Sequence, residues 1–373
     1  MTHRLVMHGG LAAALALAGC AGPAPDAGSP APPVRAASGV LASAPPVSST
    51  PGAAAGTATP SAASESGASA DIGDTTVRPG EPWIVSQRLV DPATSGVTGI
   101  YLVRPDGTGS HRLVPELAGV QMHPAWSPDG EDVTFIQENP DGTKELWIVG
   151  ADGTDARSVA TCRLPCNNMT VPEWRAADPD RIYVGRDEGL AKFMLSRLDL
   201  ATGAMVDIVV REDGATAENW RLSPDGTRAA FVRDIVTDAK RAALFVVDLA
   251  TGEERQLTAY DYSLDRPDWM PDGRIVFNSP GLGVYNTGDA EAANLWVVDA
   301  DGGNLTQLTH YTEDNSGATQ PHVLADGSGI AFTKVLDGTL LRPMGLVDID
   351  GGNDRFLTPN QSRGSHLDIR PLP

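Results

Sequence analysis

The stretch His123–Gly130, which reads His-Pro-Ala-Trp-Ser-Pro-Asp-Gly, returns in degraded form along the rest of the chain. Each copy carries one large apolar residue, called the anchor below, and most copies follow it with an Asp-Gly turn. The anchors are Trp126, Trp174, Leu222, Trp269 and Val323, and they lie 48, 48, 47 and 54 residues apart. A nearly fixed period of this size is typical of repeat architectures.

Each copy is followed by the same series of short apolar segments. After Trp126 these are Val133–Ile136, Leu146–Val149 and Ala156–Ala160, separated by turns such as Ala-Asp-Gly. Asp-Gly pairs between apolar runs favour β-hairpins, because glycine adopts positive φ at little cost. The pattern therefore predicts that each repeat is a four-stranded antiparallel sheet, which is the blade of a β-propeller.

The number of repeats predicts how the ring closes. Five complete repeats begin at residues 123, 171, 219, 266 and 320, whereas Trp83–Val114 holds only three strands and lacks an inner one. Ser365–Pro371 fits the missing strand, and its Ile369 lies 46 residues after Val323. We therefore expect an all-β, six-bladed propeller in which the C-terminal strand completes the first blade, since closure removes exposed strand edges.

These motifs resemble the TolB-type β-propeller repeat over about residues 80–373. The shared features are the Trp-Ser-Pro-Asp-Gly turn and hairpins such as Asp248–Gly252 and Asp299–Gly302, each followed by Gln-Leu-Thr. The resemblance implies a propeller and is compatible with binding of a protein. The same repeat also occurs in propellers attached to prolyl-oligopeptidase-like hydrolases and in oligogalacturonate lyases, so the fold alone does not decide the function. TolB has a globular domain ahead of its propeller, where this chain has a low-complexity tract.

The N-terminus reads as an export signal. Residues 1–20 contain one arginine, the apolar run Leu11–Ala18 and small residues before Cys20, a run too short to span a membrane. Leu17-Ala18-Gly19-Cys20 is similar to the bacterial lipobox. The resemblance implies acylation of Cys20 and a protein anchored to a membrane outside the cytoplasm, either at the cell surface or in the periplasm. The alternative is an ordinary signal peptide with an incidental cysteine.

Residues 21–78 are dominated by Ala, Pro, Ser, Gly and Thr. Such a tract cannot bury enough apolar surface to offset the entropy of ordering it. We expect a disordered tether over residues 21–78 and the propeller over residues 79–373. A glycosylated or wall-spanning stalk has a similar composition.

The remaining cysteines, Cys162 and Cys166, lie between the second and third blades. In an exported, oxidising setting they are expected to form a disulfide with each other. A free dithiol and a metal site are the alternatives.

Composition and motifs exclude several functions. The net charge is −20, with 48 acidic residues against 28 basic ones, which argues against a nucleic-acid partner. The sequence has no Gly-x-Ser-x-Gly elbow, no Gly-rich phosphate loop and no His-Glu-x-x-His. No catalytic residue and no cofactor are therefore assigned, and a non-enzymatic protein is favoured.

Superposing the repeats gives one candidate site. Three residues before the anchors stand His123, Val171, Asn219, Arg266, Gln320 and His366; one residue before them stand Ala125, Glu173, Arg221, Asp268, His322 and Asp368. These residues are expected to ring one mouth of the central channel. The predicted ligand-binding mouth consists of His123, Asn219, Arg266, Gln320, His322 and His366.

Two other readings of the mouth stay open. His123, Gln320 and His366 loosely resemble the His/Gln metal site of oligogalacturonate lyases, by repeat position only. Alternatively, the polar residues are simply solvated strand ends. The anchors themselves are expected to be core between blades. A long loop, residues 278–293, adds Tyr285 as a candidate binding residue, because long loops on rigid scaffolds often bind ligands.

Together these features predict a monomeric, membrane-anchored lipoprotein whose propeller binds a protein, a peptide or an envelope polymer. The alternative function is a metal-dependent glycan lyase of the oligogalacturonate type.

Overall fold

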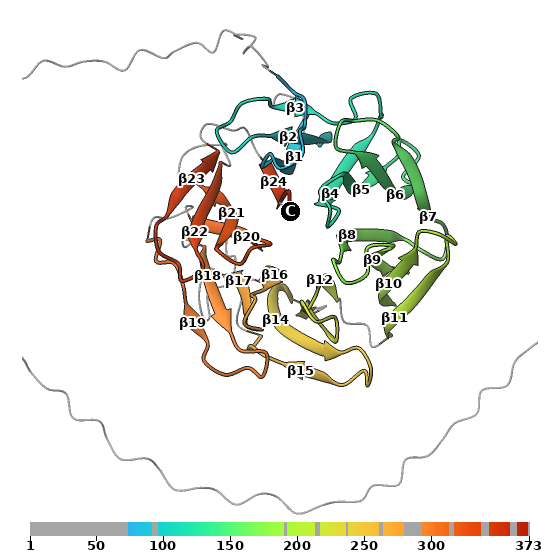
Figure 1. Ribbon diagram of the computed structural model, residues 1–373. Coiled ribbons are helices and arrows are strands. Elements are labelled where there is room, and N and C mark those ends of the chain that lie inside the picture. The colour runs from blue at the N-terminus through green and yellow to red at the C-terminus, as the bar shows by residue number, and fades with distance from the viewer. Residues whose placement is uncertain are drawn as a thin grey trace, which may run out of the picture. The chain divides into compact units, whose positions relative to one another are not determined.

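The computed structural model describes residues 74–371, apart from 92–95, 190–191, 213–216, 236–237, 261–263, 280–292, 313–316, 337–342 and 359–363. These residues form 24 strands in six sheets of four, arranged as blades around a common axis (Figure 1). Over the same residues no helix occurs, and so none long and apolar enough to cross a membrane. The predicted six-bladed propeller is confirmed.

The blades follow one another along the chain, and each is an antiparallel sheet with its inner strand named first. Blade 1 is β24 (Gly364–Ile369), β1 (Ile84–Leu89), β2 (Thr98–Val103) and β3 (His111–Arg112). Blade 2 is β4 (Val120–Trp126), β5 (Asp132–Glu138), β6 (Lys144–Gly150) and β7 (Arg157–Cys162), and blade 3 is β8 (Asn168–Trp174), β9 (Arg181–Asp187), β10 (Phe193–Asp199) and β11 (Met205–Arg211).

Blade 4 is β12 (Glu218–Leu222), β13 (Arg228–Ile235), β14 (Asp238–Asp248) and β15 (Glu254–Gln256). Blade 5 is β16 (Asp265–Trp269), β17 (Ile275–Ser279), β18 (Asn294–Val298) and β19 (Thr306–Gln307). Blade 6 is β20 (Gly317–Val323), β21 (Gly329–Val335), β22 (Met344–Asp348) and β23 (Arg355–Thr358).

The C-terminal strand closes the ring as predicted. β24 pairs antiparallel with β1, with Ile369 opposite Ile84 and Leu367 opposite Ser86, and it is the innermost strand of its blade (Figure 1). Arg370, just after β24, donates from Nε to the carbonyl of Gly130 in blade 2 at 2.7 Å. The last residues therefore join blade 1 to blade 2 as well as completing blade 1.

The hydrophobic core is divided into six clusters, one at each interface between neighbouring blades. Short alternating strands produce this division, because each sheet has two faces and each face packs against one neighbour. The anchors Trp126, Leu222, Trp269 and Val323 are buried in the clusters that join their blade to the preceding one, as the sequence predicts.

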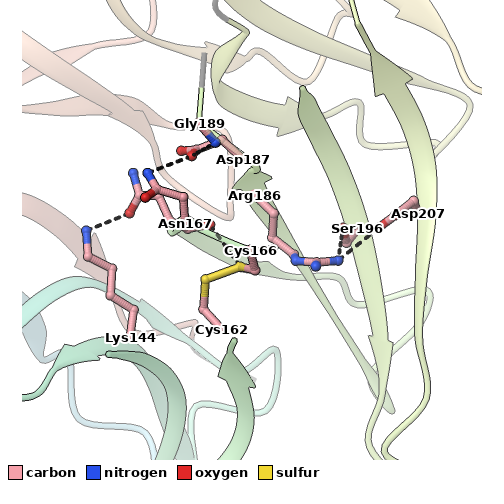
Figure 2. The surroundings of a disulfide bond; sticks show 10 residues. Lys144, Cys162, Cys166, Asn167, Arg186, Asp187, Gly189, Ser196 and Asp207 are labelled. Carbon is pink, nitrogen blue, oxygen red and sulfur yellow. Dashed lines mark hydrogen bonds and ion pairs between the residues drawn. A yellow bond between two sulfur atoms is a disulfide. The ribbon is translucent and has the colours of Figure 1, made fainter. Parts of the chain in front are cut away.

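Between blades 2 and 3 the core is tied covalently. Cys162, the last residue of β7, forms a disulfide with Cys166, which precedes β8, and both are buried (Figure 2). Lys144 of blade 2 donates to Asn168 Oδ1 at the start of blade 3, at 2.6 Å. The bridge thus reinforces an interface that already has apolar and polar contacts.

Leu367 gives a test of the closing strand. Its side chain is 5% exposed and packs in the cluster between blades 6 and 1. Leu367→Ala should lower the free energy of unfolding by about 2–4 kcal/mol, through lost burial and the cavity left behind. Urea denaturation measures this. Val206→Ala, at a residue 50% exposed on β11, is the control and should change stability by less than about 0.5 kcal/mol. Equal effects of the two substitutions would contradict a closing role for β24.

Candidate ligand-binding cavity at the channel mouth

Every inner strand contains a bulge at the same place. The pairing register shifts just before each anchor, and the residue three positions before the anchor has positive φ. These bulge residues are His123 (53°), Val171 (47°), Asn219 (54°), Arg266 (35°), Gln320 (55°) and His366 (52°). Left-handed backbone is uncommon for residues other than glycine, so its recurrence in all six blades marks a structural requirement. In four copies proline follows, which a bulge tolerates because no ladder donor is needed there.

The bulge turns a backbone N–H toward the preceding blade. Gln87 Oε1 accepts from the N–H of His123 at 3.2 Å, and His123 Nδ1 accepts from that of Val171 at 3.2 Å. Asn278 Oδ1 accepts from the N–H of Gln320 at 3.0 Å, and Gln320 Oε1 from that of His366 at 2.9 Å. His123 and Gln320 therefore bond one blade to the next.

This bonding bears on the metal-site hypothesis for His123, Gln320 and His366. The two imidazoles lie with their ring centroids 4.6 Å apart, and burial, followed by the charge of Arg266, holds the pKa of each well below its usual value. Since Nδ1 of His123 accepts a hydrogen bond, the neutral ring carries its proton on Nε2. Within the described part of the chain, no group of three or more His, Cys, Asp or Glu side chains is placed to hold a metal ion.

A second tier, one residue before the anchors, opens to a cavity of about 440 Å³. We call it the mouth tier; its members are Ala125, Glu173, Arg221, Asp268, His322 and Asp368. All six line the cavity together with the five anchors and Ile369, which holds the anchor position of blade 1. None of the bulge residues lines it. Of the six residues predicted to form the mouth, only His322 therefore faces this cavity.

The carboxylates of the mouth tier alternate around the ring, on blades 1, 3 and 5. Each accepts a hydrogen bond from the anchor N–H of the next blade. Asp368 Oδ2 accepts from Trp126 at 2.7 Å, Glu173 Oε2 from Leu222 at 3.1 Å, and Asp268 Oδ2 from Val323 at 2.8 Å. The mouth carboxylates thus fix blades in pairs while keeping further oxygen atoms near the cavity.

His322 lies between two of these carboxylates. Its Nε2 is 2.8 Å from Asp368 Oδ1, and its Nδ1 is 3.6 Å from Asp268 Oδ2. Burial disfavours the charged imidazole, but Asp368 and then Asp268 outweigh it, so the pKa of His322 is raised. Burial likewise opposes ionisation of Asp368, but His322 and the Trp126 N–H lower the pKa of that carboxyl.

Glu173 is different. Burial raises its pKa to about 7, and the opposing effects of Arg221 and the Leu222 N–H do not cancel this. Near neutral pH the carboxyl is therefore present in both forms and can either donate or accept a hydrogen bond. Its position in the repeat was visible in the sequence, but nothing local marked it as a buried acid.

The cavity combines a polar ring with apolar walls. The walls include Trp126, Trp174 and Trp269 together with prolines such as Pro271. Clefts of roughly 300–1,000 Å³ with apolar walls and a few placed polar groups are typical of ligand sites. Two of the residues predicted to bind or to anchor, Tyr285 and Cys20, lie outside the described residues.

Glu173 yields a pH test of this geometry. Because its folded-state pKa is raised from 4.5 to about 7, the folded protein holds this proton more tightly than the unfolded chain. Wild-type stability should therefore fall as pH rises through this interval. The side chain of Glu173→Gln cannot ionise. The free energy of unfolding of this variant, minus that of wild type, should therefore increase from about pH 5 to about pH 7 and stay constant above that pH. Urea titrations measure the difference. Glu116→Gln, at an exposed glutamate, should show no such gain, and parallel wild-type and Glu173→Gln curves would refute the buried acid.

Comparison with known proteins agrees with this architecture. Crystallised TolB from Acinetobacter baumannii is similar over 78% of this chain and 66% of its own, with a TM-score of 0.59 and 16% identity. A protein from Agrobacterium tumefaciens assigned as TolB is similar over 79% of this chain and 99% of its own, with a TM-score of 0.52 and 20% identity. The resemblance to the TolB-type propeller is thereby confirmed at the level of the fold.

Sequence relatives extend the comparison. The uncharacterised protein Atu1656 of Agrobacterium fabrum is 26% identical over 258 residues, which are 66% of this chain and 78% of that protein. Dipeptidyl-peptidase 5 of Porphyromonas gingivalis is 35% identical over 100 residues, but these are only 13% of its length. The family described as the lipoprotein LpqB beta-propeller domain matches residues 101–309, which is more than half of the chain. The chain therefore belongs to the LpqB lipoprotein β-propeller family.

Proposed function

We propose that this protein is a lipid-anchored, extracytoplasmic binding protein whose mouth cavity takes a peptide segment of a protein partner. The observation that carries the proposal is the cavity itself, lined by the mouth tier and the anchor of every blade. No catalytic step is assigned to it.

The construction of the cavity supports binding. Its three carboxylates are held by hydrogen bonds from the backbone of neighbouring blades, so they lose little side-chain freedom when a ligand enters. Trp174, Leu324 and Ala325 are less buried than the other apolar residues of the wall and supply apolar contact area for a protein segment. A cavity with apolar walls and a ring of polar groups is better suited to bind a short extended peptide segment than to bind a flat surface of another protein.

The N-terminal sequence supports the location. Leu17-Ala18-Gly19-Cys20 fits a lipobox, residues 21–78 have the composition of a tether, and the matched family is described as a lipoprotein. TolB-type propellers are the related fold. The proposed organisation is a signal peptide over residues 1–20, a tether over residues 21–78 and the propeller over residues 79–373. Such a tether keeps the cavity near the membrane while leaving it free to meet partners.

Cys20 tests the anchor. In fractionated cells the wild-type chain should be found with membranes and should incorporate labelled palmitate. Cys20→Ser should remove the label and move most of the protein to the soluble fraction, since the lipid chains supply the attachment. Cys166→Ser is the control for loss of a cysteine as such. A membrane-bound, unlabelled Cys20→Ser protein would refute the lipid anchor.

The binding role is tested by photo-crosslinking in cells. A photoreactive residue at Ala325, which is exposed and lines the cavity, should capture a protein partner. The same residue at Val206, on the outer strand β11, should capture little. Adding Ala125→Trp, which fills the cavity, should reduce the Ala325 adduct by about tenfold or more. Equal yields at both positions, or an adduct unaffected by Ala125→Trp, would refute binding in the cavity.

A further inference from the structure

Arg221 lines the cavity with a guanidinium that no described residue satisfies. Among the residues that the structure describes, none accepts a hydrogen bond from this side chain and no carboxylate lies within 4.0 Å of it. Its neighbours in the mouth tier are already engaged: Asp268 and Asp368 contact His322 and accept backbone hydrogen bonds. By contrast, Arg175 at the cavity rim donates to the carbonyls of Ser223 and Pro224.

The Arg221 side chain reaches toward the channel axis. It comes from blade 4, yet its charge is close enough to act on titratable groups in four other blades: His366 and Asp368 of blade 1, His123 of blade 2, Glu173 of blade 3 and His322 of blade 6. Only a position near the middle of the ring brings one group close to all of these.

The bulge residues form a separate polar layer that does not line the cavity. The imidazoles of His123 and His366 are in contact, and Arg266, from blade 5, is buried and acts on both. The charged groups that a ligand meets in the cavity are therefore those of the mouth tier, together with Arg175.

The chemistry of the cavity selects the kind of chain end. A guanidinium presents a planar fork of donors that matches a carboxylate with two parallel hydrogen bonds, and enclosure by protein strengthens the pairing. Beside Arg221 an ammonium group at a peptide N-terminus would be repelled by the same charge, and the carboxylates of Asp268 and Asp368 are already engaged by His322 and by backbone N–H groups. Glu173 lies within electrostatic range of Arg221. In its protonated form it can donate a hydrogen bond to a carboxylate oxygen of the ligand.

We propose, resting on the function above, that the cavity binds the C-terminal end of a peptide, whose terminal carboxylate pairs with Arg221. Trp174 and the other accessible apolar residues of the wall then contact the last side chains of the peptide.

The test compares matched peptide pools on one protein. The full chain carrying Cys20→Ser is incubated with N-acetylated tripeptides as free acids and with the same tripeptides as C-terminal amides. A third pool of amides carries glutamate side chains, and a fourth probe is galacturonic acid. Retained probe is quantified by mass spectrometry. The free acids should be retained about tenfold or more over the other three probes.

Variants assign the effect to Arg221. Arg221→Met should abolish the preference for free acids, and Arg221→Lys should leave a reduced one, because ammonium lacks the planar fork. Arg274→Met, at a surface arginine paired with Asp272, should behave as wild type. Arg221→Met should keep the wild-type melting temperature, since the side chain makes no hydrogen bond to the described residues.

Each other outcome is decisive. Equal retention of acids and amides, a preference that survives Arg221→Met, or retention of no probe overturns the inference. Retention of the glutamate pool or of galacturonic acid at the level of the free acids overturns the choice of a peptide C-terminus. If Ala125→Trp abolishes retention but Arg221→Met does not change it, binding in the cavity stands and only the role of Arg221 is refuted. Retention indifferent to Ala125→Trp removes the proposed function.

Discussion

The left-handed bulge in every inner strand is the constraint on which the centre of this propeller depends. A regular strand would direct all its N–H groups along its own sheet, and neighbouring blades would then meet only through apolar side chains. The bulge frees one N–H per blade, and in four blades a side chain of the preceding blade is seen to accept it. Buried backbone donors need acceptors, so the side chains that supply these acceptors have a structural role in joining the blades.

This constraint separates two tiers that look alike in the sequence. Both carry histidine and arginine at fixed positions in the repeat; the bulge residues add two amides and the mouth tier adds three carboxylates. Among the bulge residues, His123 and Gln320 form hydrogen bonds between blades, whereas the mouth tier lines the cavity. In the mouth tier one oxygen of each carboxylate holds the next blade. The other oxygens of Asp268 and Asp368 accept the N–H groups of Trp269 and Ile369, whereas the Arg221 side chain has no hydrogen-bond partner among the described residues. Structural and binding roles thus lie two residues apart on one strand.

The fold was predictable because it depends on local signals repeated along the chain. The anchors set the period, Asp-Gly set the hairpins, and Ser365–Pro371 supplied the missing inner strand; the structure confirms all three. The site was predictable only in part. His322 faces the cavity, but His123 and Gln320 do not, because the bulge decides which polar residues face inward. The sequence hint was the proline after His123, Val171, Arg266 and Gln320, which indicates a break in the ladder.

The charge balance of the mouth follows from the same geometry. Three carboxylates occupy alternate blades, and two of them are shared with His322, which leaves Glu173 facing Arg221 without direct contact. Burial favours the neutral form of Glu173, so this carboxyl balances the charge of Arg221 only in part. An enclosed positive charge facing a half-protonated acid is costly unless something anionic completes it. Among the described residues nothing pairs with Arg221, and the six surrounding blades fix the position of its charge. A terminal carboxylate bound as proposed would complete the charge balance at this point.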